Sequence, residues 1–293
     1  MINDFVYLRP TSVKETLALL AQYKDACKMI CGGQSLLILL RQGLVAPEYL
    51  IDIKSLNELN YIRFDPGAGL RIGATTTHRA IERAPVIREH YPVLADMETH
   101  LASIQTRNWG TIGGNLSHAD PAGDPAPVLV ALNATLKMAN GDGERTMPVE
   151  DFSLDYFETA LGEGGLLLEI QVPLPPPKTA TVYEKFAVIE SDQGLVSVAA
   201  SITLDEGGKR CKEGRVMLGA AAPIPKRSKK AEALLAGAEF SDGLLEQVGQ
   251  AASEDAEPIT DIHATEAYRR ELVKVMAKRM VRKAWEQAQA SGR

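Results

Sequence analysis

The sequence predicts an α+β protein built from two domains, and three features of the chain lead to this prediction. Short strand-like apolar runs and helix-like runs alternate over the first part of the chain. The proline-rich segment "PLPPPK", residues 173–178, reads as a linker. After it the pattern changes to strand-like segments followed by helices. At 293 residues and 45% hydrophobic, the chain can bury a large core, and we place the boundary near Pro176.

Residues 1–54 are expected to form a small α/β unit. Ser12 and Glu15 make a capping-box pattern, which predicts a helix from about Val13 to Gln22. "CKMI" follows as a short buried strand. "SLLILLRQG" is typical of a helix that ends at Gly43, and "EYLIDI" of a second strand.

Residues 55–176 complete the first domain. "LNYIRFDPGAGLRIGATTTH" alternates around an Asp-Pro-Gly turn and predicts a hairpin. The next segment is helical with proline breaks. "APVLVALNATLKMANGDGERTMPVEDF" then predicts a helix and two strands joined by a tight turn, and "GGLLLEIQVPLP" a further strand.

Residues 177–293 are expected to form the second domain. "TVYEKFAV" and "VSVAASITLDEGGKRCKEGRVMLGAAA" predict three antiparallel strands. Three helices follow, in "SKKAEALLAGA", "DGLLEQVGQAASE" and "TEAYRRELVKVMAKRMVRKAWEQAQ".

Charge and composition argue against nucleic acid and membranes as partners of this chain. The net charge of -6 gives no basic field for nucleic acid, and 5% aromatic residues leave little for base stacking. No apolar run reaches the roughly 18 residues of a membrane span. The first residues show no signal-peptide pattern, so we expect a cytoplasmic protein.

No metal or iron–sulfur site is expected in this chain. The three cysteines, Cys27, Cys31 and Cys211, are too few for a four-thiolate cluster or a disulfide framework. The five histidines form no close ligand pair.

The most informative feature is a pair of Gly-Gly segments, "CGGQS" at residues 31–35 and "TIGGN" at residues 111–115. Glycine lets the backbone come close to a ligand, and successive amides can bind an anion. The chain contains neither the G-x-G-x-x-G fingerprint nor a P-loop. A single Gly-Gly turn is often only structural, but two followed by small polar residues favour a phosphate-containing cofactor.

The segments "CGGQSLLILLRQGLVAPEYLIDI" and "TIGGNLSHADPAGDPAPVLVAL" resemble the two flavin loops of a known family. That family comprises the FAD-binding medium subunits of molybdenum hydroxylases, the group of enzymes that includes aerobic carbon monoxide dehydrogenase and xanthine dehydrogenase. The resemblance extends through "RIGATTTH", "YEKFA" and "YRRELVKVMAKR" to nearly the whole chain. It implies a two-subdomain FAD-binding fold of the PCMH (vanillyl-alcohol oxidase-like) type, followed by a C-terminal domain with a three-stranded antiparallel sheet and helices.

The resemblance also implies a set of FAD-binding residues and no catalytic residue in this chain. The matching positions are Gly32, Gly33, Gln34 and Ser35 in the first segment, Thr111, Ile112, Gly113, Gly114 and Asn115 in the second, and Leu101, Asp124, Leu167 and Lys185 elsewhere.

Ordinary structural roles compete with these assignments. On residue type alone, Leu101 and Leu167 would be core residues, Lys185 a surface lysine and Asp124 a helix N-cap.

Two positions depart from the family pattern. Cys31 replaces the usual alanine and adds a thiol that could oxidise. Gln193 stands where relatives often carry an aromatic residue beside the flavin, which leaves open what shields the ring.

The implied function is electron transfer. In the family, a large subunit hydroxylates the substrate at a molybdenum cofactor, and a small subunit carries two [2Fe–2S] clusters. Electrons then reach FAD on the medium subunit and pass to an external acceptor, commonly within a dimer of heterotrimers. A self-sufficient flavoprotein oxidase or reductase of the same fold, and a non-enzymatic nucleotide-binding scaffold, stay open as alternatives. Neither the substrate nor the electron acceptor follows from this sequence.

Overall fold

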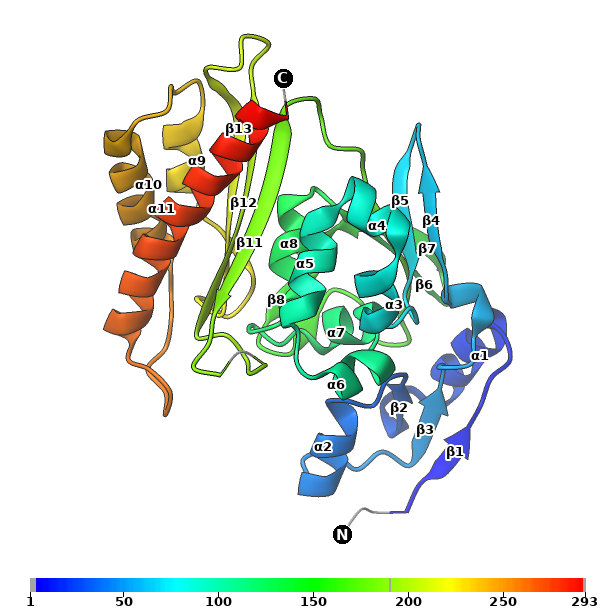
Figure 1. Cartoon of the computed structure of the whole chain (residues 1–293). Helices are drawn as coiled ribbons and strands as arrows, with labels where there is room; N and C mark the ends of the chain where they lie inside the picture. The colour runs from blue at the N-terminus through cyan, green and yellow to red at the C-terminus, as the bar shows by residue number, and fades with distance from the viewer. Residues whose placement is uncertain (1–3, 190, 292–293) are drawn as a thin grey trace.

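The computed structural model describes residues 4–189 and 191–291. Its first unit is a parallel three-stranded sheet of order β1-β3-β2, with α1 and α2 in the connections (Figure 1). The elements are β1 (Val6–Leu8), α1 (Val13–Tyr23), β2 (Cys27–Ile30), α2 (Leu36–Gln42) and β3 (Tyr49–Asp52). The Ser12 side chain accepts a hydrogen bond from the amide of Glu15, and Gly43 ends α2 with φ of 71°. Both predicted helix boundaries follow from these local signals.

The second unit is an antiparallel five-stranded sheet of order β4-β5-β10-β6-β7, with helices α3 to α8 beside it (Figure 1). Its strands are β4 (Ile62–Asp65), β5 (Gly69–Gly73), β6 (Thr135–Asn140), β7 (Gly143–Pro148) and β10 (Leu166–Val172). Its helices are α3 (His78–Arg83), α4 (Pro85–His90), α5 (Pro92–His100), α6 (Ile104–Trp109), α7 (Ile112–His118) and α8 (Pro125–Ala131). Prolines at the first positions of α4 and α5 divide the predicted helical stretch, since proline starts helices readily but cannot continue them.

Some elements of this unit are absent from the sequence-based prediction. These are α6, α7 and the small hairpin of β8 (Ser153–Asp155) and β9 (Glu158–Thr159). All are short, and short helices and strands have little periodicity from which a pattern can be recognised.

The C-terminal sheet has the order β11-β12-β13-β14, with all pairs antiparallel. The three predicted strands are β11 (Thr179–Phe186), β12 (Val196–Leu204) and β13 (Cys211–Gly219), and the two-residue β14 (Lys226–Arg227) adds an edge. The three predicted helices are α9 (Lys229–Leu235), α10 (Asp242–Asp255) and α11 (Glu266–Ala290).

Both faces of this C-terminal sheet are covered. Helix α11 packs on β11 and β12 on one side, while α5 and α8 of the preceding unit pack on the other (Figure 1). Every residue of β12 is consequently buried. Ala199 and Met217 of the sheet belong to the same hydrophobic cluster as the helices of the second unit, so the sheet packs directly against that unit.

A buried aromatic residue on α11 gives a test of the C-terminal core. Trp285 is fully buried, and no described residue accepts a hydrogen bond from its Nε1. We expect Trp285→Ala to lower the free energy of unfolding by about 3–5 kcal/mol because it leaves a large cavity. Trp285→Phe should cost clearly less, since it keeps an aromatic ring and removes an unpaired donor. Urea unfolding checks both variants, and equal losses would contradict this account of the core.

Candidate functional site

The first glycine segment lies between β2 and α2 and leaves several polar groups unused. Gly33 has φ of +69°, a conformation that glycine adopts without strain. Among the described residues, no backbone acceptor takes a hydrogen bond from the amides of Gly33, Gln34 or Ser35. The Ser35 side chain also makes no capping hydrogen bond to α2. These half-buried donors form a group that an anion can use.

The second glycine segment is a helix, not a turn, which corrects the prediction of two similar loops. Thr111 caps α7, and its hydroxyl accepts a hydrogen bond from the amide of Gly114 at 3.3 Å. The amides of Ile112 and Gly113 donate to Thr76 O and Ala74 O, at 3.1 and 3.0 Å. The capping threonine carries the glycines into a helix, so their amides are already used inside the protein.

Gly113 is instead a point of close packing. A Cβ on this residue would lie 2.5 Å from the carbonyl oxygen of Ala74. Only glycine therefore lets α7 approach the end of β5 so closely.

The first glycine segment contacts the backbone of Trp109 and Gly110, the two residues directly before the second segment. A Cβ on Gly32 would lie 2.4 Å from Trp109 O and 2.6 Å from Gly110 Cα. Lys54 Nζ donates to the same Trp109 carbonyl at 2.7 Å. The structure thus brings the two predicted segments into one site, although they are distant in sequence.

A buried charge pair lies at the boundary with the C-terminal sheet. Lys185 Nζ on β11 lies 2.8 Å from Asp124 Oδ2 and also donates to the carbonyl of His100 at 2.8 Å. The hydroxyl of Tyr183 donates to Asp124 Oδ1 at 2.5 Å. Burial raises the pKa of Asp124 while Lys185 lowers it, and burial together with Asp124 raises the pKa of Tyr183 well above its ordinary value.

This pair differs from what the residue types alone suggest. Asp124 stands at the N-cap position of α8 but makes no side-chain cap hydrogen bond, because its carboxylate is engaged by β11. The side chain of Lys185 is only 3% exposed, so it is not a surface lysine. A buried ion pair of this kind is typical of a functional site as well as of a structural one.

Leu101 and Leu167 both lie in the hydrophobic cluster of the second unit. Leu101 ends α5, and Leu167 lies at a register shift of β10. Their burial agrees with a core role, and a contact with the cofactor stays a prediction.

Cys31 and Gln193, which depart from the family pattern, each hydrogen-bond with a neighbouring side chain. Burial raises the pKa of the half-buried Cys31 thiol, whereas Thr111 lowers it through a hydrogen bond. A raised pKa keeps the thiol protonated and less reactive. The Gln193 amide donates to Asp120 Oδ2 at 2.7 Å, on the exposed side of the site.

Sequence reasoning missed a buried acid–imidazole pair beside the second segment. His78 Nδ1 lies 3.0 Å from Glu98 Oε1 and 2.9 Å from Oε2, and both side chains are nearly inaccessible to water. A signal was present, because Glu98 lies on α5 four residues after Leu94 and three before Leu101. A carboxylate on the apolar stripe of a helix indicates a buried partner.

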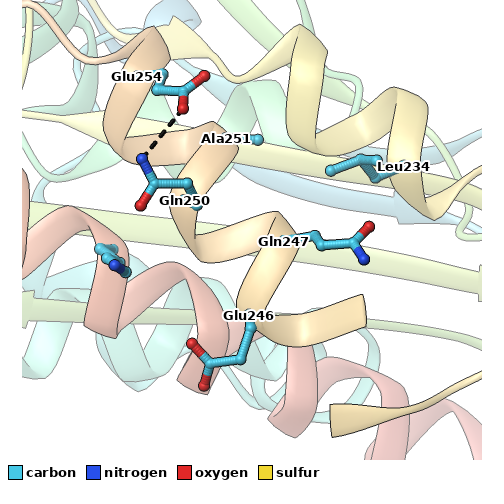
Figure 2. Close-up of a pocket in the computed structure, with 7 residues that line it drawn as sticks. Leu234, Glu246, Gln247, Gln250, Ala251 and Glu254 are labelled. Carbon is cyan, nitrogen blue, oxygen red and sulfur yellow. Dashed lines mark hydrogen bonds between the residues drawn. The ribbon is translucent and has the colours of Figure 1, made fainter. Parts of the chain in front are cut away.

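A surface depression of about 470 Å³ lies away from these residues. Figure 2 shows it on α10, where Gln250 donates to Glu254 Oε1 at 3.1 Å. Its lining, which also includes Leu234 of α9 and Lys274 of α11, offers no buried polar group. We assign no function to it.

The described residues contain no group of three His, Cys, Asp or Glu side chains arranged for a metal ion. Among these same residues, no helix is both long enough and apolar enough to span a membrane.

Known proteins give the family of the chain. Residues 3–175 match the model "FAD binding domain in molybdopterin dehydrogenase". Residues 181–284 match "CO dehydrogenase flavoprotein C-terminal domain". The glyceraldehyde dehydrogenase medium chain of Sulfolobus acidocaldarius is 34% identical over 93% of this chain and 95% of its own length. The carbon monoxide dehydrogenase medium chain of Hydrogenophaga pseudoflava is 31% identical over 96% of this chain and 97% of its own length.

Solved structures agree with the sequence matches. Carbon monoxide dehydrogenase from Hydrogenophaga pseudoflava superposes with a TM-score of 0.94 at 32% identity, over 98% of this chain and 99% of the other. Quinoline 2-oxidoreductase from Pseudomonas putida 86 gives a TM-score of 0.92 at 31% identity, over 99% of each chain. The predicted fold class, the FAD cofactor and the assignment to an oxidoreductase are confirmed. The chain belongs to the family of FAD-binding medium subunits of molybdenum-type dehydrogenases.

Proposed function

We propose that this chain is the electron-exit subunit of a molybdenum-dependent hydroxylase or dehydrogenase. It would hold the FAD that takes electrons from the [2Fe–2S] clusters of a partner and passes them to an external acceptor. The observation that carries the proposal is the backbone contact between Gly32 and Trp109–Gly110. It brings a set of unused donors against the residues directly before the second glycine segment, within a chain of this family.

The donors of the first segment fit the pyrophosphate of FAD. The unused amides of Gly33, Gln34 and Ser35 and the Ser35 hydroxyl are neutral donors suited to a phosphate oxygen. The amides of the second segment are used internally, and the close backbone approach to the first segment comes from Trp109 and Gly110 directly before it. When bound, FAD supplies electron exchange in steps of one or two electrons. The proposed FAD-binding residues are Gly32, Gly33, Gln34, Ser35, Leu101, Thr111, Ile112, Gly113, Gly114, Asn115, Asp124, Leu167 and Lys185.

Lys185 and Asp124 would set the charge beside the cofactor. The ammonium of Lys185 is buried against the carboxylate of Asp124, so its positive charge is fixed in a region of low dielectric. Such a cation stabilises negative charge gained by a neighbouring group. The pair also joins the predicted domains 1–176 and 177–293, whose exact boundary stays a prediction.

The proposed partners are a large subunit with the molybdenum cofactor and a small subunit with two [2Fe–2S] clusters. Support comes from the relatives, which are named as medium chains, and from the related carbon monoxide dehydrogenase structure, which is described as lacking the Mo-pyranopterin moiety of the molybdenum cofactor. A dimer of heterotrimers and a cytoplasmic location stay predictions from the family resemblance.

Co-purification from the native host tests this function. We expect the chain to elute with one larger and one smaller subunit, and the complex to contain FAD, molybdenum and iron. Adding candidate N-heterocycles, aromatic thioesters, carbon monoxide or aldehydes should bleach the flavin only in the intact complex. Hydroxylation of a substrate by this chain alone would refute the proposal, and a complex without molybdenum would refute it as well.

Substitution of Gly32 tests the contact of the two segments. In Gly32→Ala the new methyl group would meet the backbone of Trp109 and Gly110, which cannot rotate away. We expect FAD affinity to fall at least tenfold, about 1.4 kcal/mol. Gly141→Ala is the matched control because a Cβ there meets nothing within 4 Å. Fluorescence titration of the deflavinated chain measures both, and unchanged affinity in Gly32→Ala would contradict the assignment.

Removal of the Lys185 cation tests the buried pair. Lys185→Met leaves Asp124 buried without the cation that lowers its pKa, so that pKa rises further. We expect a loss of about 3–5 kcal/mol in unfolding free energy at pH 8. Because a raised folded-state pKa favours the folded form only at low pH, the loss should shrink as the pH falls through the pKa of Asp124.

The double variant Lys185→Met with Asp124→Asn should recover much of the stability and show no such pH dependence. Denaturant unfolding at several pH values measures the series. A pH-independent loss in Lys185→Met would mean that Asp124 is not the group left uncompensated.

A further inference from the structure

The small hairpin of β8 and β9 exposes three large apolar side chains at its tip. Leu154, Tyr156 and Phe157 are 55, 41 and 58% exposed. Single exposed apolar residues are common on protein surfaces, but three within four successive residues, two of them aromatic, are typical of a docking surface. The proposed function gives this hairpin no role.

Phe157 is held in place with backbone strain. Its φ of 57° lies in the left-handed region, which is unfavourable for a bulky side chain. The Phe157 amide donates to the carbonyl of Ala119 at 3.2 Å, and its ring centroid lies 5.1 Å from that of His118, the last residue of α7. The hairpin is therefore fixed against the helix that contains the second glycine segment. Strained residues of this kind persist most often at functional surfaces.

A second exposed apolar segment meets the hairpin at the same place. Val188 and Ile189, just after β11, are 76 and 60% exposed. Gln193 of the same connection donates to Asp120 Oδ2 at 2.7 Å, and this aspartate directly follows the alanine to which Phe157 donates. The exposed side chains of the two segments are here called the apolar face, which consists of Leu154, Tyr156, Phe157, Val188 and Ile189.

The apolar face lies next to both parts of the proposed FAD site. Lys185, whose ammonium is buried against Asp124, is followed in the chain by Phe186 and then by the second exposed segment. The hairpin reaches the site from the other side, through α7 and its capping Thr111. A molecule docked on this face would therefore lie beside the site of electron exchange.

Carboxylates surround the apolar face, and cations are scarce. Asp155, Glu158 and Asp192 are exposed on the two segments. Neither residues 146–177 nor residues 186–208 contain a Lys or an Arg. Arg145, just before the first of these stretches, donates to the carbonyl of Ala160 at the base of the hairpin. The face therefore carries a negative potential, which attracts cationic partners and repels anionic ones.

We infer that the apolar face docks the external electron acceptor, and that this acceptor is a one-electron carrier protein with a basic rim around an apolar centre. The inference rests on the proposed function and names the class of its acceptor. An apolar centre inside a charged rim suits a small, rapidly formed protein complex, in which opposite charges speed the encounter.

The charges disfavour a nicotinamide dinucleotide as the acceptor. Its pyrophosphate is anionic, and the two exposed stretches supply no Lys or Arg to bind it. With a carrier protein, two molecules in turn would each gain one electron, and two protons of the reduced flavin would pass to solvent.

Binding of ferricytochrome c, a basic haem protein, to the complex purified from the native host tests the predicted charge. The dissociation constant should rise steeply as the ionic strength increases to about 0.2 M. Succinylated cytochrome c, whose lysines carry carboxylates instead of ammonium groups, should bind at least about tenfold more weakly at low salt. Isothermal titration calorimetry measures both. Equal binding of the two forms would overturn the inference.

Substitution of Phe157 tests the apolar centre. Phe157→Asn removes the ring and introduces a residue that tolerates the left-handed backbone, so the fold should be kept. We expect it to weaken binding of ferricytochrome c about tenfold. Ile262→Asn, at an apolar residue that is 95% exposed in another part of the surface, is the matched control and should bind like the unmodified complex. Equal binding by Phe157→Asn and its control would overturn the inference.

Removal of two rim charges tests the carboxylates. Asp155→Asn with Glu158→Gln should weaken binding at low salt and flatten its dependence on ionic strength. Glu206→Gln with Glu271→Gln removes two exposed charges outside this face and should keep the original dependence. The same dependence in both double variants would mean that net charge, not this face, attracts the carrier.

Anaerobic electron transfer separates an acceptor site from a contact between subunits. The complex is reduced with dithionite, and its reoxidation by ferricytochrome c or by ferricyanide is followed by stopped-flow absorbance. Phe157→Asn should slow the reaction with ferricytochrome c about tenfold and leave that with ferricyanide unchanged. Loss of a subunit from the variant complex, or an equal slowing with a water-soluble quinone, would overturn the inference. Those outcomes leave the proposed function intact, whereas a complex without FAD would refute it.

Discussion

The site depends on one backbone contact, the approach of Gly32 to the Trp109–Gly110 peptide. The hypothetical Cβ distances of 2.4 and 2.6 Å mean that no other residue fits at position 32 without moving backbone. Because the contact involves main-chain atoms, side-chain rearrangement cannot relieve it. Together with the hydrophobic cluster that joins Ile51 and Ile53 to Leu166 and Leu168, it holds the small parallel sheet against the second unit. The unused amides, Lys54 and the thiol of Cys31 are all arranged around it.

The two glycine segments look alike in sequence but act differently. The first ends a strand and leaves its amides unused, whereas the second starts a capped helix and uses them internally. Thr111, the first residue of the second segment, makes this difference, since its hydroxyl caps the helix. The first segment therefore supplies donors, and the backbone of Trp109 and Gly110 directly before the second segment packs against it.

Local signals in the sequence predicted much of the fold, because they act within a few residues. Ser12 with Glu15, Gly43 and the Asp-Pro-Gly turn set element boundaries that the structure reproduces. Long-range burial could not be predicted in the same way. Lys185 on an alternating strand is buried against Asp124 and the His100 carbonyl, and the family resemblance, not local pattern, pointed to both charged residues. Glu98 was detectable as a charge on an apolar helix face, but its partner His78 was not.

The Asp124–Lys185 ion pair can form only after β11 has been synthesised and has docked. The two residues are separated by 61 positions, with three strands of the five-stranded sheet (β6, β7 and β10) and the linker between them. During synthesis the aspartate leaves the ribosome well before the strand that brings its cation. Until β11 is docked, the carboxylate keeps its water and the wall of the site beside it stays open. In the proposed FAD site the Asp124–Lys185 pair is complete only once β11 has docked, so we expect cofactor insertion at a late stage of maturation.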